Sequence, residues 1–252
     1  MDTDTRTRFR ELHASGIFVI PNPWDVGSAT ILVEMGFPAL ATTSSGHAMS
    51  LGRTDGEVTR DELVDHVATL ARAVDVPVHV DAERCFSDTL EGVAETVHLL
   101  AGAGAAGVSI EDWDRATGAT DPLDQAAARV GAAVGAAREH GVVITARAEN
   151  HIRGNPDLDD TIARLQAYRD QGAECLYAPG LADLDEIARL VREVAAPVNV
   201  LARPDGPSVA EMGTVGVRRV STGGGLARYA YDALRRAARE LQDEGTSTYA
   251  SR

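Results

Sequence analysis

The chain alternates short apolar runs with amphipathic segments from end to end, and this alternation restricts the possible folds more than any other feature. Eight runs have the length and composition of buried strands: Ile17–Pro21, Ala39–Thr43, Val76–Val80, Gly107–Ile110, Val142–Ala146, Cys175–Ala178, Pro197–Leu201 and Arg219–Thr222. The segments between them place apolar residues at helical spacing, as Leu184, Ile187 and Val191 do. Strands that alternate with helices form parallel sheets. Eight repeats therefore predict an α/β fold of the (β/α)₈ TIM-barrel type.

The ends of the helical segments carry residues that start and stop helices. Thr59 and Asp183 are each followed three residues later by a glutamate, the pattern of a capping box. Glycines precede the next strand at Gly36, Gly104, Gly141, Gly172 and Gly216. A doubly wound open sheet is the alternative, but no G-x-G-x-x-G turn follows the first strand and no linker divides the chain. We expect one barrel domain over residues 1–245 and a disordered C-terminal tail over 246–252.

Composition excludes several classes of protein. All 24 basic residues are arginine, and enzymes that use a lysine Schiff base, lysine-anchored pyridoxal phosphate or a Walker-type loop are excluded because each needs a lysine amine. The net charge of −14 argues against nucleic acid or an anionic membrane as a partner. Cys85 and Cys175 are too few for a disulfide framework. With no signal peptide or membrane-spanning run in the sequence, we expect a cytoplasmic protein.

Acidic side chains follow two neighbouring predicted strands. Asp81 and Glu83 follow the third strand, and Glu111 follows the fourth. Functional side chains of such barrels collect at the carboxyl ends of the strands, and residues two apart on a strand face the same side. Carboxylates held close together share a proton, meet arginines or bind a cation. This oxygen-rich set favours Mg²⁺, or Mn²⁺, as the bound ion. The alternative is that Asp81 and Glu83 only cap the loop or pair with Arg84.

Arg147 ends the apolar run VVITAR, where an isolated charge is costly unless it meets an anion. It is predicted to hold a substrate carboxylate or oxyanion, and an ion pair with Glu149 or Glu111 is the alternative. The sequence SSG at 44–46 suits an anion-binding loop, although a tight turn would use the same residues.

Six motifs, in this order along the chain, resemble those of the phosphoenolpyruvate mutase/isocitrate lyase superfamily. They are NPWD at 22–25, TSSG at 43–46, SLGRTD at 50–55, DAE at 81–83, SIED at 109–112 and TARAE at 145–149. A looser match continues through 177–180, 197–200 and 221–224. The resemblance implies a barrel with a Mg²⁺ site. It also implies that the last helix swaps onto a neighbouring subunit, which would give a homodimer or a homotetramer.

The resemblance also implies roles for single residues. It places Asp81, Glu83 and Glu111 at the metal, some of them through water, with Asp55 as an outer partner. Together with the analysis of the residues themselves, it yields two candidate sets. The catalytic set is Arg147, His47, Asp55 and Glu149. The set that binds a small anionic carboxylic acid is Ser44, Ser45, Gly46, His47, Arg147 and Asn199.

Two departures from the family pattern restrict the chemistry. The loop at 113–121 lacks the Lys-Lys/Arg-Cys-Gly-His motif of the isocitrate and methylisocitrate lyases, and also the loop lysine and asparagine of the mutases. The run RCFS at 84–87 lacks the glycines that usually follow the acids of the third strand. Within it, Cys85 is either a reactive thiol beside an arginine or a small buried residue.

These observations predict an enzyme, a Mg²⁺-dependent lyase that cleaves a carbon–carbon bond of a small 2-oxo or 2-hydroxy carboxylic acid through a pyruvate-like enolate. Decarboxylation would need no base, whereas a retro-aldol cleavage would need one, for which His47, His151 and Asp114 are the candidates. Two alternatives remain open. One is a phosphonopyruvate mutase or hydrolase that acts on a phosphorus–carbon bond, and the other is a non-catalytic, metabolite-binding barrel of the same family.

Overall fold

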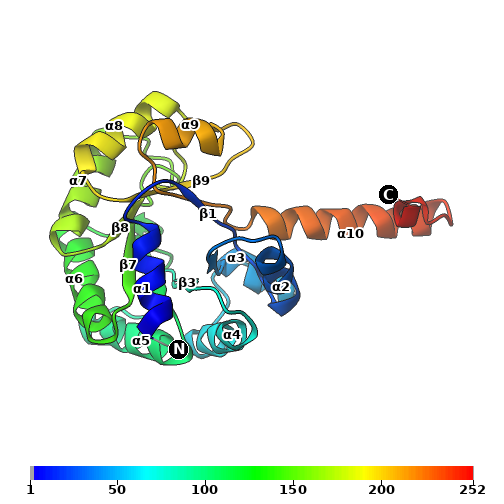
Figure 1. Cartoon of the computed structure of the whole chain (residues 1–252), viewed down its shortest axis with the longest axis horizontal. Helices are drawn as coiled ribbons and strands as arrows, with labels where there is room; N and C mark the ends of the chain where they lie inside the picture. The colour runs from blue at the N-terminus through cyan, green and yellow to red at the C-terminus, as the bar shows by residue number, and fades with distance from the viewer. Residues whose placement is uncertain (1–2, 252) are drawn as a thin grey trace.

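The computed structural model describes residues 3–251, and its centre is a parallel eight-stranded sheet curled into a nearly closed barrel (Figure 1). The strands are β1 (Phe18–Ile20), β2 (Leu40–Ala41), β3 (Val78–Asp81), β4 (Gly107–Glu111), β7 (Val143–Arg147), β8 (Cys175–Tyr177), β9 (Val198–Leu201) and β10 (Arg219–Ser221). They neighbour one another in the order β1-β10-β9-β8-β7-β4-β3-β2. Between the two outer strands, the Ala41 N–H donates to the Pro21 carbonyl at 3.0 Å. All eight predicted strands are present, and the predicted barrel class is confirmed.

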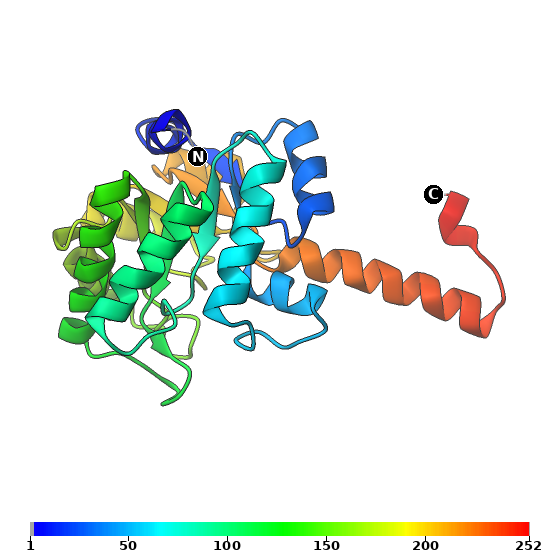
Figure 2. The same ribbon diagram turned by 90° about the horizontal axis from the view of Figure 1, so that it is seen from below.

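Helices cover the outside of the barrel (Figures 1 and 2). They are α2 (Val26–Glu34), α3 (Ser44–Ser50), α4 (Arg60–Ala73), α5 (Leu90–Ala103), α6 (Leu123–His140), α7 (Leu158–Asp170), α8 (Leu184–Val194) and α9 (Val209–Thr214). The capping box predicted at Thr59 and Glu62 begins α4, and Asp183 caps α8 by accepting from two backbone N–H groups. The five glycines predicted to end helices all have positive φ. Local sequence signals therefore account for most helix boundaries.

One helix precedes the first repeat and lies at the amino-terminal end of the strands. Helix α1 (Thr3–Leu12) buries Phe9 completely, and its ring stacks on His79 with centroids 5.7 Å apart. A Cβ on Gly107 would lie 2.6 Å from the Phe9 ring, so this strand position needs glycine. This helix was not predicted, because Phe9 is its single deeply buried apolar side chain and gives no helical period. The helix closes the end of the barrel opposite the mouth, where the strands end.

The loop after β4 contains a small hairpin that was not predicted. Strands β5 (Trp113–Asp114) and β6 (Ala119–Thr120) pair antiparallel, and the turn between them carries Arg115. Gly118 in this turn has a φ of +67°. The hairpin follows Glu111 directly, so it lies at the carboxyl end of the barrel and brings the Arg115 side chain over the mouth.

Helix α10 (Gly225–Asp243) extends away from the barrel in both views (Figures 1 and 2). Its first turns pack against α3, but Tyr229 is 72% exposed and Leu234 is 62% exposed. A short 3₁₀ helix, η1 (Thr248–Ser251), follows. The disorder expected for 246–252 stays a prediction, and residue 252 lies outside the described residues. Within the described chain, no helix combines the length and the apolar character needed to cross a bilayer.

Candidate active site

An arginine joined to three carboxylates lies at the mouth of the barrel. The Arg147 guanidinium is 2.8 Å from Asp81 Oδ1, 3.0 Å from Glu111 Oε2 and 2.7 Å from Glu149 Oε1. Pairing of β4 with β7 sets Glu111 opposite Arg147, and β3 brings Asp81 to the same end of the sheet. The ion pairs that the alternative names, with Glu149 and Glu111, are present, and the role of Arg147 in holding a substrate anion stays a prediction.

Burial controls the protonation of this cluster. Burial raises the pKa of Glu111, and the attraction of Arg147 does not offset the effect. Burial lowers the pKa of Arg147, but the charges of Glu149, Glu111 and Asp81 outweigh it and hold that pKa well above its ordinary value. The guanidinium therefore stays charged, while Glu111 binds a proton more readily than a free carboxylate does.

A second arginine spans the remaining acids. Arg115 donates through Nε to Glu83 at 3.0 Å and through Nη2 to Asp55 at 2.9 Å. A Cβ on Gly56 would lie 2.8 Å from the Arg115 guanidinium carbon, so glycine there lets Arg115 lie against the backbone. Burial and the nearby Asp81 raise the pKa of Glu83 to about 7. Within the described chain, Arg84 forms no ion pair with Asp81 or Glu83 and instead pairs with Asp121 and Asp88.

Glu83 lies in a loop and not, as expected, on the strand. Strand alternation was expected to align it with Asp81, but β3 ends at Asp81 and Glu83 has a φ of +48° in the loop beyond. The Glu111 N–H donates to the Glu83 carbonyl at 2.9 Å and holds this loop against β4. Left-handed backbone at a non-glycine residue is sparsely populated and is often found at functional sites.

A cavity of about 280 Å³ adjoins Arg147 inside the barrel mouth. Of the predicted residues, those that line it are Ser44, Ser45, Asp55, Asp81, Arg147, Glu149 and Asn199. The Ser44 N–H donates to Asp81 Oδ2 at 3.1 Å, so the anion held by this loop amide is a carboxylate of the protein itself. Glu83 and Glu111 line an adjoining cavity of about 260 Å³, which also contains Arg115.

Two predicted substrate-binding residues lie away from the cavity. His47 stacks on His66 of α4 with ring centroids 3.7 Å apart, and neither of its ring nitrogens has a hydrogen-bond partner within the described chain. Gly46 packs where a Cβ would lie 3.2 Å from Trp24 and from Ala227. Helix α3 begins at Ser44, and each further residue turns the side-chain direction by about 100° around the helix axis. The turn of the helix therefore points the two serines and His47 in different directions.

The remaining candidates for a base or a nucleophile are occupied or enclosed. The Asp114 carboxylate accepts from the Ala116 N–H and the Thr117 hydroxyl in the hairpin, and the first of these bonds lowers its pKa. His151 is partly buried beside Gly180 and is not among the residues that line the mouth cavity. Cys85 is fully buried, and burial raises its thiol pKa to about 12. The thiol is therefore protonated and shielded, as the small-buried-residue interpretation requires.

Several residues of the cavity wall were not predicted, and Tyr177 and Arg219 are two polar ones among them. The Tyr177 ring lies 5.3 Å from the Arg147 guanidinium carbon, and burial raises the Tyr177 pKa to about 12. Arg219 is 2% exposed and donates to Asn199, Thr145 and His13, with no carboxylate partner in the described chain. Both side chains occupy strand positions that face the barrel interior. The polar residues at those positions were the available signal.

A further residue, Asp112, holds the backbone of the site in place. Asp112, adjacent to Glu111, is buried and accepts from the Glu149 N–H at 2.8 Å and from the Tyr168 hydroxyl at 2.6 Å. Its carboxylate also pairs with Arg164 at 3.0 Å. These bonds hold the backbone after β7 and thereby orient Glu149 towards Arg147.

Comparison with known proteins identifies relatives over most of the chain. The family model for phosphoenolpyruvate phosphomutase matches residues 9–242. An uncharacterised protein of Mycobacterium tuberculosis is 38% identical over 85% of this chain and 81% of its own. A 2-methylisocitrate lyase from Aeropyrum pernix is 32% identical over 72% of this chain and 60% of its own. An oxaloacetate decarboxylase from a Bradyrhizobium strain is 30% identical over 78% of this chain and 69% of its own.

A solved structure is also similar over nearly the whole length. A putative lyase/mutase from Burkholderia cenocepacia superposes with a TM-score of 0.95 at 49% identity, over 98% of this chain and 92% of that one. This agreement extends the likeness from the barrel strands to the loops that surround the mouth.

Proposed function

The chain belongs to the phosphoenolpyruvate phosphomutase family, and from this premise we propose a divalent-metal-dependent lyase that cleaves a carbon–carbon bond of a small 2-oxo or 2-hydroxy carboxylic acid. The membership confirms the superfamily that the motifs indicated. The observation that carries the proposal is the cluster of Arg147 with Asp81, Glu111 and Glu149 beside the cavity. Relatives named 2-methylisocitrate lyase and oxaloacetate decarboxylase support carbon–carbon chemistry, and the name of the family model keeps phosphorus–carbon chemistry as the alternative.

The oxygen donors of the site support a divalent cation. Five carboxylates gather at the mouth, those of Asp55, Asp81, Glu83, Glu111 and Glu149, and burial raises the pKa of Glu83 and of Glu111. A bound cation would offset the cost of that burial and favour the charged form of both carboxylates. Carboxylate oxygens are the ligands that Mg²⁺ and Mn²⁺ prefer. Asp81, Glu83 and Glu111 would hold the ion, and when bound it would stabilise negative charge on the substrate oxygens.

Arg147 would bind the substrate carboxylate or the oxygen that becomes negative as the bond breaks. Glu149 fixes the orientation of Arg147, because one carboxylate oxygen accepts from both Nε and Nη2 of the guanidinium. The other oxygen of Glu149 binds Arg153 at 3.1 Å. The Ser44 and Ser45 hydroxyls in the cavity wall would donate to the same anion. Glu149 and Asp55 are thus positioning residues in this proposal, acting through Arg147 and Arg115.

Decarboxylation is the reaction that the cavity favours. Loss of CO₂ needs no base, whereas a retro-aldol cleavage must remove a hydroxyl proton. Of the three expected bases, His47 and His151 are absent from the lining of both cavities in the described chain. Asp114 lines the adjoining cavity, but its carboxylate accepts from the Ala116 N–H and the Thr117 hydroxyl within the hairpin. After CO₂ leaves, the enolate carbon must take up one proton. Tyr177 keeps its proton at neutral pH and lines the cavity beside Arg147, so we assign it that transfer, with water restoring the phenol proton.

The test measures pyruvate release from oxaloacetate by chelator-stripped protein with and without added Mg²⁺. Mg²⁺ alone decarboxylates oxaloacetate slowly, so each rate is compared with the same Mg²⁺ concentration without protein. We expect activity only with the metal, and loss of it in Asp81→Ala. The control is Asp170→Asn, because the Asp170 carboxylate is 65% exposed beside Arg169 at the end of α7. Calorimetric titration with oxalate, an enolate mimic, should give Mg²⁺-dependent binding that Arg147→Ala weakens.

Two outcomes would redirect the assignment. Oxalate binding together with phosphate release from phosphonopyruvate, and no pyruvate from any 2-oxo or 2-hydroxy acid, would indicate a phosphorus–carbon enzyme. Metal-dependent oxalate binding without turnover of either class of substrate would indicate the non-catalytic, metabolite-binding alternative.

We also propose that α10 packs against a second copy of the chain. The helix leaves the barrel with Tyr229, Leu234 and Leu241 exposed, and large apolar side chains on one extended helix favour burial in an interface. A homodimer or a homotetramer would cover them. Because α10 starts at Gly225, directly after residues that line the cavity, its packing would also fix the rim of the mouth.

A further inference from the structure

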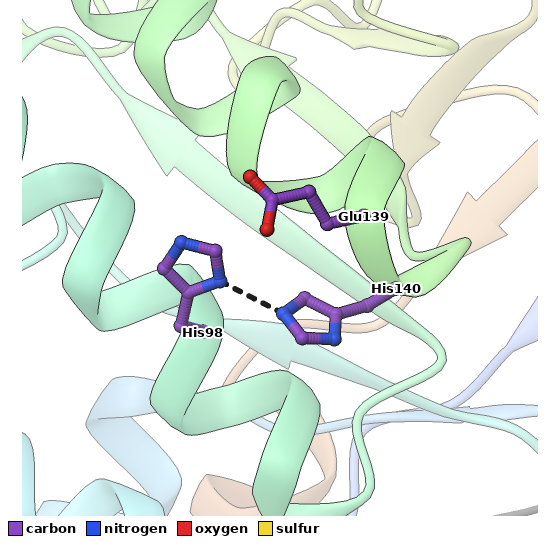
Figure 3. A group of neighbouring side chains, drawn as sticks. All are labelled: His98, Glu139 and His140. Atoms are coloured by element: carbon purple, nitrogen blue, oxygen red, sulfur yellow. Dashed lines mark hydrogen bonds between the residues drawn. The ribbon is translucent and has the colours of Figure 1, made fainter.

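Three potential metal ligands lie together on the outer layer of helices (Figure 3). His98 belongs to α5, and Glu139 and His140 form the end of α6. His98 Nδ1 is 2.8 Å from His140 Nε2, and one ligand atom from each of the three side chains lies within 4.8 Å of the others. We propose that this group, the α5–α6 cluster, binds a divalent transition-metal ion of the zinc class.

The cluster is separate from the barrel mouth. Helix α6 ends at His140 and leads into the start of β7, whereas Arg147 and the acids lie at the ends of the strands. The Arg6 side chain of α1, the helix that closes the amino-terminal end of the barrel, donates to the His140 carbonyl at 2.8 Å and to the Ala101 carbonyl at 2.6 Å. The proposal therefore stands independently of the chemistry assigned to the mouth.

The backbone on both sides of the cluster is held in place. Helices α5 and α6 pack against each other, and the neighbours of His98 in α5, Val97 and Leu100, are fully buried. On α6, Ala133 and Ala137 are buried as well. Ligands on packed helices keep their spacing without the metal, which lowers the cost of ordering them when it binds.

The side chains of the cluster have few competing partners. The two imidazoles bond to each other, with rings at 79°, and the exposed Glu139 carboxylate forms no ion pair with another residue of the described chain. One imidazole must donate and the other accept in the metal-free state. Arg6 brings a positive charge nearby, but its donors are directed at the backbone carbonyls of Ala101, Ala105 and His140.

The ligand types select the ion. Two imidazole nitrogens and one carboxylate suit Zn²⁺, Co²⁺ or Ni²⁺, whereas Mg²⁺ prefers oxygen ligands alone. Tetrahedral Zn²⁺ with Zn–N bonds of about 2.0–2.1 Å would separate the two nitrogens by about 3.3 Å. The rings must therefore move apart by about half an ångström, and the shared proton must move to the outer nitrogen of its ring. Water would take the fourth position, because Glu139 is exposed.

The experiment titrates Zn²⁺ into chelator-stripped full-length protein in saturating Mg²⁺, which occupies oxygen-rich sites. We expect one Zn²⁺ to bind with heat release and to raise the temperature of thermal unfolding. His98→Ala and His140→Ala should each weaken binding by at least about tenfold, a loss that removing even a partner of a ligand can cause. Glu139→Gln should weaken it less. Co²⁺ in place of Zn²⁺ should add visible absorption that the two histidine variants lack.

His151→Ala is the matched control, because His151 is a partly exposed histidine outside the cluster and should leave Zn²⁺ affinity unchanged. Circular dichroism confirms that each variant is folded. Binding that survives in the His98→Ala, His140→Ala double variant would overturn the proposal. So would binding that Asp81→Ala removes, because the ion would then occupy the mouth, and so would the absence of Zn²⁺ binding to the wild-type chain.

Discussion

Replacing Arg147 by methionine should destabilise the metal-free protein by several kilocalories per mole at pH 8. The guanidinium contacts Asp81, Glu111 and Glu149 at 2.7–3.0 Å, and its side chain is 15% exposed. Removing one partner from a buried ion pair costs about 3–5 kcal/mol, because the other charge stays buried without compensation. Three carboxylates share this one cation, so their separate losses do not add. We expect about 3–5 kcal/mol in total.

The loss should shrink as the pH falls. Burial raises the pKa of Glu111 in the folded state, so this carboxyl contributes stability that is fully present below its unfolded pKa of 4.5 and is lost as the pH rises through the folded value. Without Arg147 that folded pKa rises further, and the variant should regain stability between pH 8 and pH 5.5. Mg²⁺ should restore part of the loss at pH 8, since the ion replaces the missing positive charge.

Urea unfolding of chelator-stripped protein at pH 8 and pH 5.5 measures both effects. Arg10→Met is the matched control, because the Arg10–Glu174 pair has side chains 45% and 37% exposed and should contribute less than about 1 kcal/mol. A loss below about 1 kcal/mol in Arg147→Met, equal at both pH values, would contradict the reasoning. It would mean that the three carboxylates do not depend on this guanidinium.

Three further predictions concern other parts of the molecule. Tyr177→Phe should lower kcat by about 10²–10⁴-fold with little change in KM, measured as pyruvate release, and an unchanged kcat would remove Tyr177 as the acid. His13 has a pKa of about 3 because it is buried, so its contribution to stability is present above its unfolded pKa of 6.5. That contribution falls by about 2 kcal/mol between pH 7 and pH 5, and the free energy of unfolding of His13→Gln, measured in urea, should therefore depend less on pH. Leu234→Glu should reduce the mass in solution measured by light scattering, whereas Arg192→Glu on α8 should not; equal masses would argue against an interface along α10.

The barrel could be predicted because the evidence for it is local. Each strand is a short apolar run that lies near a helix cap or a glycine. The signals that indicate strands and helices are the spacing of apolar residues, the capping residues and the glycines that end helices, and each of them spans only a few residues. The order of eight such repeats then leaves few ways to connect them. Asp81, Glu111 and Arg147 could be named as neighbours for the same reason, because parallel strands place their carboxyl ends at one mouth.

Local pattern was insufficient where a side-chain direction depends on packing with distant segments. His47 was placed in the site with Ser45, but the rotation of α3 directs its ring to His66 on α4. Arg115 lay in a loop without recognisable motifs, and only the hairpin brings it to Glu83 and Asp55. The sequence assigned Arg219 only to a strand. The structure shows that its hydrogen-bond partners in the described chain, Asn199 and Thr145 among them, include no carboxylate.

The sequence by itself determined the strand and helix order, the family, and which strand ends carry acids and arginines, because these follow from short-range periodicity and motif order. The tertiary structure alone decided which charges meet. It set one guanidinium among carboxylates from three segments, and it brought His98 to His140, 42 residues away along the chain. Such contacts depend on how each helix is rotated and packed against segments that are distant in the sequence. The local pattern of residues along one chain does not specify that rotation.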